Sequence, residues 1–338
     1  MTPPLLDIRG LVRDYAGRPP QRALDGVSLT VAAGSIVGVV GESGCGKSTL
    51  ARLAAALDRP TAGQVLLDGE DLHALPGRAH ARRRRDVQMV FQDPYGALDP
   101  RWRVGRIVAE PLHALAARPD RAARDARVAE VLAAVGLTAE DARRFPHAFS
   151  GGQRQRIAIA RALVTRPRLV VADEAVSALD LSVQAQVLNL ILDLRDRDGI
   201  AVLFITHNLG AVEAVCDRVA VMYLGRIVET GPMPQAFDRP LHPYTRRLLA
   251  AAPGLDPAAR PPRPAVAPLA SDPATWDGCA FRPRCPLAVD RCRGEPPPLR
   301  GLPGEPDRLV ACHRADALEA DALEAVGLSP KRSFNDGP

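Results

Sequence analysis

The stretch Gly41-Glu-Ser-Gly-Cys-Gly-Lys47-Ser48-Thr49 decides the fold of this chain. It follows the apolar run 36–40, which is typical of a buried strand, and it opens a helical pattern that stops before Pro60. Glycines at this spacing let successive backbone N–H groups face a phosphate, and the start of the helix adds a partial positive charge. We therefore predict a phosphate-binding loop, called the P-loop below, between a strand and a helix.

The lysine of this loop is unusual for the chain. Of the 44 basic residues, Lys47 and Lys331 are the only lysines. A position that keeps lysine in such a chain needs a compact ammonium, here for terminal phosphates. The hydroxyl of Ser48 would supply an oxygen for Mg²⁺. The predicted contacts of the loop with its phosphate ligand are Gly41, Ser43, Gly44, Cys45, Gly46, Lys47, Ser48 and Thr49.

Composition narrows the class of protein. The 338 residues are 46% hydrophobic and 25% charged, as in a soluble globular protein, and no apolar run approaches the roughly 18 residues of a membrane helix. The N-terminus lacks the pattern of a secretion signal, so we expect a cytosolic chain with reduced cysteines. The charge of +5 comes almost wholly from arginine, which indicates codon bias, and we expect no nucleic-acid partner.

Strand and helix patterns place the loop in an α/β fold. Short β-rich runs at 5–15 and 23–31 precede the P-loop, and the segment 107–135 has helical spacing without a strand-like run. From residue 157 onward, strand-like and helix-like runs alternate. Such alternation predicts a mostly parallel sheet, whose ligands bind beyond the carboxyl ends of its strands.

Two carboxylates follow one of these strands. The apolar run 169–172 ends in Asp173 and Glu174, which places Asp173 at the carboxyl edge of the sheet. There Asp173 can hold the shell of Mg²⁺, and Glu174 can orient or deprotonate a water molecule. A strand that ends in two carboxylates is common by chance, but downstream of a P-loop it indicates the second half of the same site.

Further motifs point to a known family. Phe149-Ser150-Gly151-Gly152-Gln153-Arg-Gln-Arg156 resembles the signature motif of ABC-transporter ATPases. In the same order as in that family, Gln92 matches the Q-loop, Asp180 the D-loop and His207 the switch histidine. Tyr15 lies where the family stacks an aromatic ring on adenine. The resemblance covers roughly residues 5–250.

This resemblance implies a fold and a chemistry. The fold is an α/β P-loop NTPase with an antiparallel β subdomain, a mostly parallel core sheet and a helical subdomain, here followed by a cysteine-containing C-terminal extension. The activity is ATP hydrolysis with ATP and Mg²⁺ as cofactors. Glu174, His207 and Gln92 would be catalytic, and Ser48, Gln92 and Asp173 would hold Mg²⁺.

The signature motif predicts a second subunit. Ser150 and the two glycines after it cap a helix that runs through 157–163, so the chain has a second helix N-terminus suited to an anion. The resemblance implies that two ATPase domains pair head to tail, with each signature closing on ATP held by the other P-loop. The residues implied in that contact are Ser150, Gly151, Gly152, Gln153 and Asp180.

Two positions depart from the family pattern beside the catalytic residues. Ala175 stands where the family usually has proline, and Asn208 stands where it usually has aspartate. We expect a rate effect at most, with hydrolysis retained.

Two motifs after residue 240 narrow the kind of transporter. Leu241-His242-Pro243-Tyr244-Thr245 and Gly278-Cys-Ala-Phe-Arg-Pro-Arg-Cys285-Pro resemble segments of oligopeptide and dipeptide importer ATPases. The resemblance implies peptide import, with a second ATPase subunit, two membrane permeases and an extracytoplasmic solute-binding protein as partners, at the cytoplasmic face of the membrane. A nickel or other small-solute importer stays open because an ATPase does not touch the solute. An exporter ATPase and a non-transport ABC ATPase acting on nucleic acid fit the motifs less well.

Four cysteines occupy the C-terminal extension at the spacing C-x5-C-x6-C-x19-C. Zinc sites usually have closer pairs, whereas four thiolates on such a segment can bind an iron–sulfur cluster. The resemblance implies a four-iron four-sulfur cluster, and zinc or free thiols remain alternatives. The implied ligands are Cys279, Cys285, Cys292 and Cys312.

The expected domain organisation has four parts. Residues 1–252 form the ATPase domain, with its helical subdomain at about 93–165. A proline-rich linker covers 253–276, the cysteine-containing segment 277–314, and a flexible tail 315–338.

Overall fold

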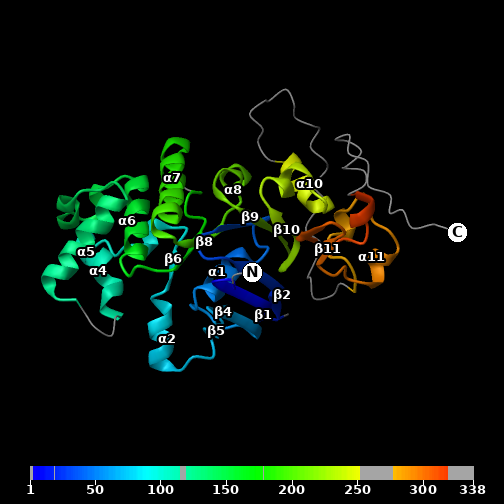
Figure 1. Ribbon diagram of the computed structural model, residues 1–338, viewed down its shortest axis with the longest axis horizontal. Helices are drawn as coiled ribbons and strands as arrows, with labels where there is room; N and C mark the ends of the chain where they lie inside the picture. Colours follow the sequence, from blue (N-terminus) through cyan, green and yellow to red (C-terminus); the bar gives the residue numbers. More distant parts are fainter. Residues whose placement is uncertain (1–2, 19, 115–118, 178, 252–276, 319–338) are drawn as a thin grey trace. The chain divides into compact units, whose positions relative to one another are not determined.

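The computed structural model describes residues 3–18, 20–114, 119–177, 179–251 and 277–318 (Figure 1). The chain forms two compact units, Met1–Arg226 and Ile227–Pro338. The expected linker at 253–276 and most of the expected tail lie outside the described residues.

The first unit begins with an antiparallel sheet. Its strands are β1 (Leu6–Tyr15), β2 (Gln21–Val31), β4 (Ala62–Leu67) and β5 (Glu70–Asp71), in the order β2-β1-β4-β5. Leu6, Ile8 and Leu11 of β1 are buried, because one face of this sheet covers the core. The predicted antiparallel subdomain is confirmed.

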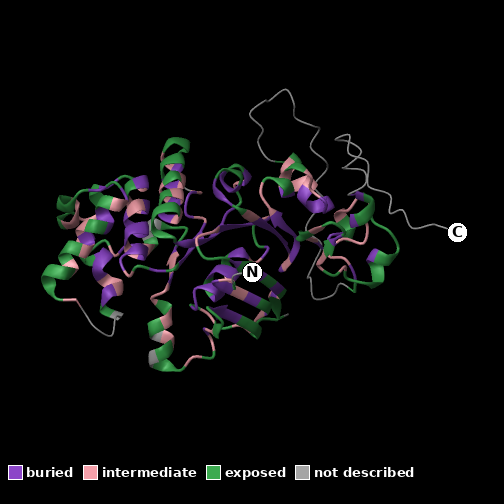
Figure 2. Cartoon of the chain, in the orientation of Figure 1, coloured by how far each residue is buried: buried purple, intermediate pink, exposed green. Residues whose placement is uncertain are grey.

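A mostly parallel sheet forms the centre of the same unit. Its strands are β3 (Ile36–Val40), β6 (Val87–Val90), β7 (Leu169–Asp173), β8 (Ala201–Ile205) and β9 (Arg218–Tyr223), in the order β9-β3-β8-β7-β6. Their pairs are parallel. Every residue of β3, β7 and β8 is buried (Figure 2), as expected of parallel strands covered on both faces. The carboxyl ends of these three strands therefore lie in fixed positions on the same side of the sheet.

Helices complete the first unit as predicted. Those that carry or adjoin the site are α1 (Lys47–Ala54), α6 (Gly151–Leu163), α7 (Leu181–Asp198) and α8 (Leu209–Val215). Between β6 and β7, every element of regular structure given for the described residues is a helix: α3 (Pro94–Ala97), α4 (Val104–Ala109), η1 (Glu110–Ala114), α5 (Arg121–Ala134), η2 (Ala139–Arg143), η3 (Pro146–Ala148) and α6. Asp120 caps α5 by accepting from the amide of Ala123 at 2.8 Å. A further helix, α2 (Gly77–Arg84), precedes β6.

The second unit contains three neighbouring strands of a sheet, which the sequence patterns did not predict. Its strands are β10 (Arg226–Pro232), β11 (Arg300–Leu302) and β12 (Glu305–Val310), in the order β11-β12-β10. Short helices accompany them, among them α9 (Gln235–Asp238), α10 (Pro243–Ala250), η6 (Arg282–Arg284) and α11 (Arg291–Gly294). Leu241, Leu302, Val310 and Ala315 share a buried cluster, so Ala315, placed in the tail from sequence, belongs to this core.

A buried ion pair fastens the His-Pro-Tyr-Thr segment to this sheet. The carboxylate of Glu229, 1% exposed on β10, accepts the amides of Leu241 and His242, each at 2.9 Å. Arg308 on β12 donates to the same carboxylate at 3.3 Å and to the carbonyl of Arg239 at 2.6 Å. Both ionic side chains are almost fully buried. Removing either one therefore leaves the other charge buried without a counterion.

The ring of His242 joins this segment to the cysteines. Its Nδ1 accepts the amide of Tyr244 at 3.0 Å, and burial lowers the pKa of His242 to about 3, so the ring is neutral. Phe281, from the cysteine segment, lies 5.8 Å from the His242 ring and 5.5 Å from the Tyr244 ring. The motif therefore anchors the cysteine segment by packing.

Replacing Arg308 with methionine is expected to destabilise the second unit by about 3–5 kcal/mol, because Glu229 would be left buried without its counterion. Amide hydrogen exchange of the second unit, followed at increasing denaturant, measures this. Arg291→Met, which removes an exposed pair with Glu295, is the control and should change little. A second substitution, Glu229→Gln, should recover part of the loss; equal stability of Arg308→Met and the parent would contradict the argument.

Candidate nucleotide-binding and hydrolysis site

The P-loop lies between β3 and α1, as predicted. A Cβ atom at Gly41 would come 2.2 Å from the carbonyl oxygen of Met222, and one at Gly46 would come 2.4 Å from that of Ala23. Gly46 also has φ 105° as the N-cap of α1, a conformation that side chains disfavour. Close packing against β9 and β2 thus requires these glycines.

Lys47 and Ser48 occupy the first turn of α1. Lys47 is 5% exposed, and its Nζ donates to the carbonyls of Gly41 at 2.8 Å and Glu42 at 3.0 Å. The ammonium is therefore held inside the loop. The Ser48 hydroxyl donates to Asp173 at 3.3 Å, and burial raises the pKa of Asp173. A hydroxyl beside a buried carboxylate is a donor set that fits Mg²⁺.

Three neighbouring strands bring the predicted catalytic residues together. Gln92 follows β6, Glu174 follows β7 and His207 follows β8. The Gln92 amide donates to Oε2 of Glu174 at 2.9 Å, and Nδ1 of His207 lies 3.3 Å from Oε1. We call these three residues the hydrolysis trio. Glu174 has φ 49°, a strained conformation for this residue type, and its amide is fixed by the carbonyl of Ile205 at 2.8 Å.

The predicted signature residues form a separate turn, called the signature turn below (Ser150, Gly151, Gly152 and Gln153). The Ser150 hydroxyl accepts the Gln153 amide at 3.3 Å, and the Ser150 amide donates to the Gln153 side chain at 3.0 Å. This capping box starts α6. A Cβ atom at Gly152 would come 2.3 Å from Val183, so the turn adjoins the start of α7, which Asp180 caps by accepting the Val183 amide at 2.9 Å.

Known proteins share this arrangement. The family model described as ABC transporter matches residues 24–177, and that described as oligopeptide/dipeptide transporter, C-terminal region, matches residues 228–292. A probable peptide ABC transporter ATP-binding protein of Sinorhizobium fredii is 50% identical over 95% of this chain and 93% of its own. The chain belongs to the ABC-transporter ATP-binding proteins.

Further relatives agree with this membership. The di/tripeptide transport ATP-binding protein DppF of Pseudomonas aeruginosa is 47% identical over 92% of this chain and 98% of its own. The ATP-binding cassette MJ0796, in a dimeric post-hydrolysis state bound to ADP and Pi, is similar with a TM-score of 0.62 and 29% identity over 68% of this chain and 98% of its own. CbiO1 of Clostridium perfringens is also similar, with a TM-score of 0.62 and 26% sequence identity over 70% of this chain and 91% of its own.

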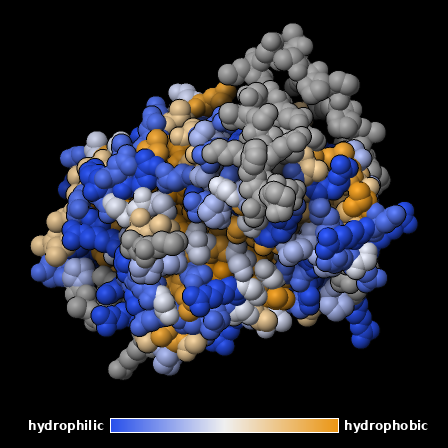
Figure 3. Space-filling model, turned by 45° about the vertical axis from the view of Figure 1, so that its right-hand side comes forward, coloured by the Kyte–Doolittle hydropathy of each residue, from blue (hydrophilic) through white to orange (hydrophobic). Residues whose placement is uncertain are grey.

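Because it belongs to this family, the chain is the ATP-hydrolysing subunit of a transporter. Its partners are therefore membrane permeases. Among the described residues, no helix is both long and apolar enough to cross a bilayer. In Figure 3, hydrophilic residues cover much of the face that is drawn, and apolar ones lie between them.

The two departures from the family pattern are accommodated by this ABC ATPase. Asn208 caps α8 by accepting the Ala211 amide at 3.2 Å, as an aspartate would. Ala175 is buried, at 3% exposed, and the bond from Glu174 to Ile205 still holds the strand end without proline. Neither change removes a member of the hydrolysis trio.

The four cysteines of the extension lie in the second unit with free thiols. The amide of Cys279 donates to the carbonyl of Cys292 at 2.9 Å, and that of Arg314 to the sulfur of Cys312 at 3.4 Å. Burial raises the pKa of Cys312 to about 11, and nearness to Cys279, Cys285 and Cys292 adds to the shift. Within the described ranges, no three histidine, cysteine or acidic side chains are placed to hold one metal ion.

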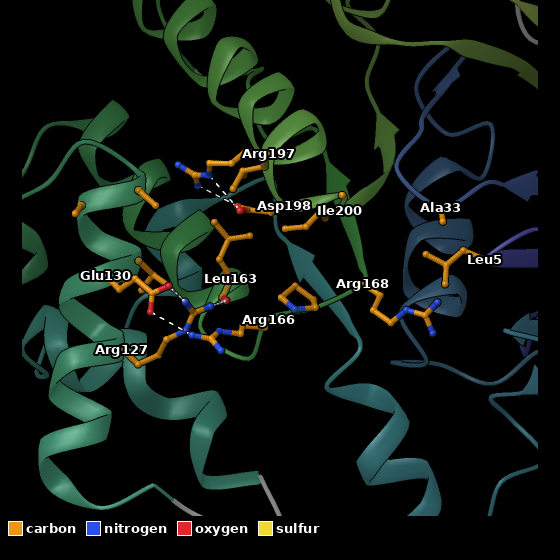
Figure 4. A pocket seen from close by; sticks show the side chains of 16 residues that line it. Leu5, Ala33, Arg127, Glu130, Leu163, Arg166, Arg168, Arg197, Asp198 and Ile200 are labelled. Atoms are coloured by element: carbon orange, nitrogen blue, oxygen red, sulfur yellow. Dashed lines mark hydrogen bonds and ion pairs between the residues drawn. The ribbon is translucent and has the colours of Figure 1, made fainter.

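A large cavity lies away from this chemistry. It measures about 900 Å³ and is lined by α5, by the end of α7 and by residues that precede β7 and β8 (Figure 4). These strand starts are opposite the edge that carries the hydrolysis trio. Glu130 lies between Arg127, at 2.6 Å, and Arg166, at 3.5 Å, and Arg197 pairs with Asp198 at 3.0 Å. These arginines are matched by carboxylates, and we assign no chemistry to the cavity.

Proposed function

We propose that this chain powers the import of di- and oligopeptides. The observation that carries the proposal is the match of residues 228–292 to the C-terminal region of oligopeptide/dipeptide transporters. In this chain that region contains the contact of His242 with Phe281, which anchors the cysteine segment. It also contains Glu229, whose counterion Arg308 lies beyond the matched residues. Relatives named for peptide transport match nearly the whole chain.

The proposed hydrolysis uses the edge where β6, β7 and β8 end. Lys47 and the loop amides bind the phosphates of ATP, and Ser48, Asp173 and Gln92 would hold Mg²⁺, which neutralises phosphate charge when bound. Glu174 accepts a proton from water as the water oxygen bonds to the terminal phosphorus and the bond to ADP breaks. Gln92 and His207 each contact one oxygen of Glu174, and each oxygen keeps a lone pair that can accept from that water.

Tyr15 and the signature turn complete the proposed nucleotide site. Tyr15, half-exposed at the end of β1, stacks on the adenine. The signature turn belongs to the site of a second ATPase subunit, identical or related, because its helix N-terminus presents amides to an anion. The dimeric state of the similar cassette MJ0796 supports this pairing.

A groove near the Q-loop fits a permease segment. Leu57 and Phe91 are exposed there, at 41% and 38%, and Arg84 and Arg85 line the same groove of about 380 Å³. Exposed apolar side chains in a hollow are typical of interaction sites. A cytoplasmic permease loop with apolar and acidic residues would contact Phe91, the neighbour of Gln92, and so sense the nucleotide. The proposal therefore has the chain act at the cytoplasmic face of the membrane, with an extracytoplasmic protein delivering the peptide.

For the cysteines we propose the four-iron four-sulfur cluster. Four thiols that influence one another electrostatically are a suitable ligand set, and a cubane cluster separates its thiolates more widely than a single ion does. Iron and acid-labile sulfide in protein purified without oxygen would support the cluster. Colourless protein without iron would remove it.

Transport measurements test the cargo. Proteoliposomes that contain the two permeases, this chain and its ATPase partner are loaded with ATP and given the solute-binding protein. Labelled di- or tripeptide should accumulate, and the Lys47→Ala variant should not support uptake. Uptake of nickel without uptake of peptide would replace the proposal with the alternative importer.

A further inference from the structure

Tyr15 is held by two residues whose role no motif indicated. Its hydroxyl donates to Oδ2 of Asp58 at 3.1 Å, and the guanidinium of Arg13 lies 4.5 Å from the centre of its ring. Arg13 in turn binds both oxygens of Asp58, at 2.9 Å and 3.1 Å. The three side chains thus form a closed set of contacts, called the ring clamp below.

The ring clamp is more than a surface ion pair. The side chains of Arg13 and Asp58 are 22% and 24% exposed, and their two parallel bonds fix the plane of the guanidinium. An unsupported tyrosine at a strand end loses side-chain freedom when a ligand stacks on it. Here the hydroxyl contact and the guanidinium contact restrict that freedom.

The clamp also connects two parts of the proposed site. Arg13 and Tyr15 belong to β1, whereas Asp58 follows α1, the helix that begins at Lys47. The position of the ring is therefore tied to the helix that carries the phosphate-binding lysine. Arg13 covers one face of the ring, and Tyr15 remains partly exposed.

We propose that Arg13 and Asp58 are positioning residues, which hold the Tyr15 ring so that its free face receives the adenine of ATP. The inference rests on the proposed function, since it takes Tyr15 as the base-stacking residue. It assigns part of the binding of the base to two side chains that do not touch the nucleotide.

Kinetics of the full chain test this role. Base stacking on an aromatic ring contributes about 1–3 kcal/mol, so Tyr15→Ala should raise the KM for MgATP about tenfold or more. Asp58→Ala and Arg13→Gln should each raise it about threefold to fivefold, with kcat within about twofold of the parent. The inhibition constant of inorganic tripolyphosphate, which has no base, should stay unchanged in all three. Arg13→Lys, which keeps the cation, should restore part of the affinity.

A matched pair on the same strand is the control. Arg9 binds Asp7 on β1 in an exposed position, and Arg9→Gln should leave the KM unaltered. If Tyr15→Ala leaves the KM at the parental value, the base-stacking assignment and the inference both fail. If Tyr15→Ala raises it but the Arg13 and Asp58 variants do not, the inference alone fails. If the Arg13 and Asp58 variants also bind tripolyphosphate more weakly, the ring clamp supports the P-loop. That result would overturn its role at the base.

Discussion

Glu174→Gln abolishes ATP turnover while MgATP still binds. The substitution removes the group that accepts the proton from water, and loss of a general base costs roughly 10²–10⁴ in rate. Glutamine keeps an oxygen that can accept the Gln92 amide, now bonded to Glu174 at 2.9 Å, so the fold of the site should persist. Phosphate release measures turnover, and gel filtration with MgATP should show a dimer trapped in the closed state.

The matched control is Glu140→Gln, which changes an exposed carboxylate of the helical insertion and should leave turnover at the parental rate. Retained hydrolysis in Glu174→Gln would reject Glu174 as the base. Loss of MgATP binding together with turnover would instead mean that Glu174 holds the nucleotide.

Mixed dimers of this chain test whether the signature turn acts on the nucleotide of the partner subunit or on the nucleotide of its own chain. Ser150→Asp keeps a good N-cap for α6, because aspartate caps as well as serine, but it sets a negative charge where a partner's phosphate should lie. Loss of one such stabilising contact costs roughly 10²-fold in rate at the affected site. Lys47→Ala inactivates a P-loop independently. Mixed dimers of differently tagged chains combine the two changes in two ways.

When one chain carries both changes, head-to-tail pairing puts one defect in each of the two nucleotide sites. Hydrolysis should then be lost at both sites. With Lys47→Ala on one chain and Ser150→Asp on the other, both defects meet in one site, and the second site stays intact and active. Phosphate release from the purified mixed dimers gives the answer. The reverse pattern would show that each signature serves its own P-loop and would end the head-to-tail proposal.

Local sequence patterns were sufficient for the main features of the first unit. The P-loop could be predicted because its glycines, lysine and helix start are contiguous, and the structure shows why glycine is needed at Gly41 and Gly46. Buried parallel strands have continuous apolar runs, so β3, β7 and β8 were visible too. The second unit was different: β12 reads Glu-Pro-Asp-Arg-Leu-Val, without a strand pattern, and pairs because β10 and β11 flank it.

By itself the sequence determined the phosphate loop, the alternation of strands and helices and the family, since these depend on neighbouring residues or on motif order. Only the tertiary structure decided which distant side chains meet. The order β8-β7-β6 brings Gln92 to Glu174 across 82 positions, and the turn after α1 brings Asp58 to Tyr15. Such contacts follow from sheet order and packing, which act between segments far apart in the chain and leave no periodic trace within either one.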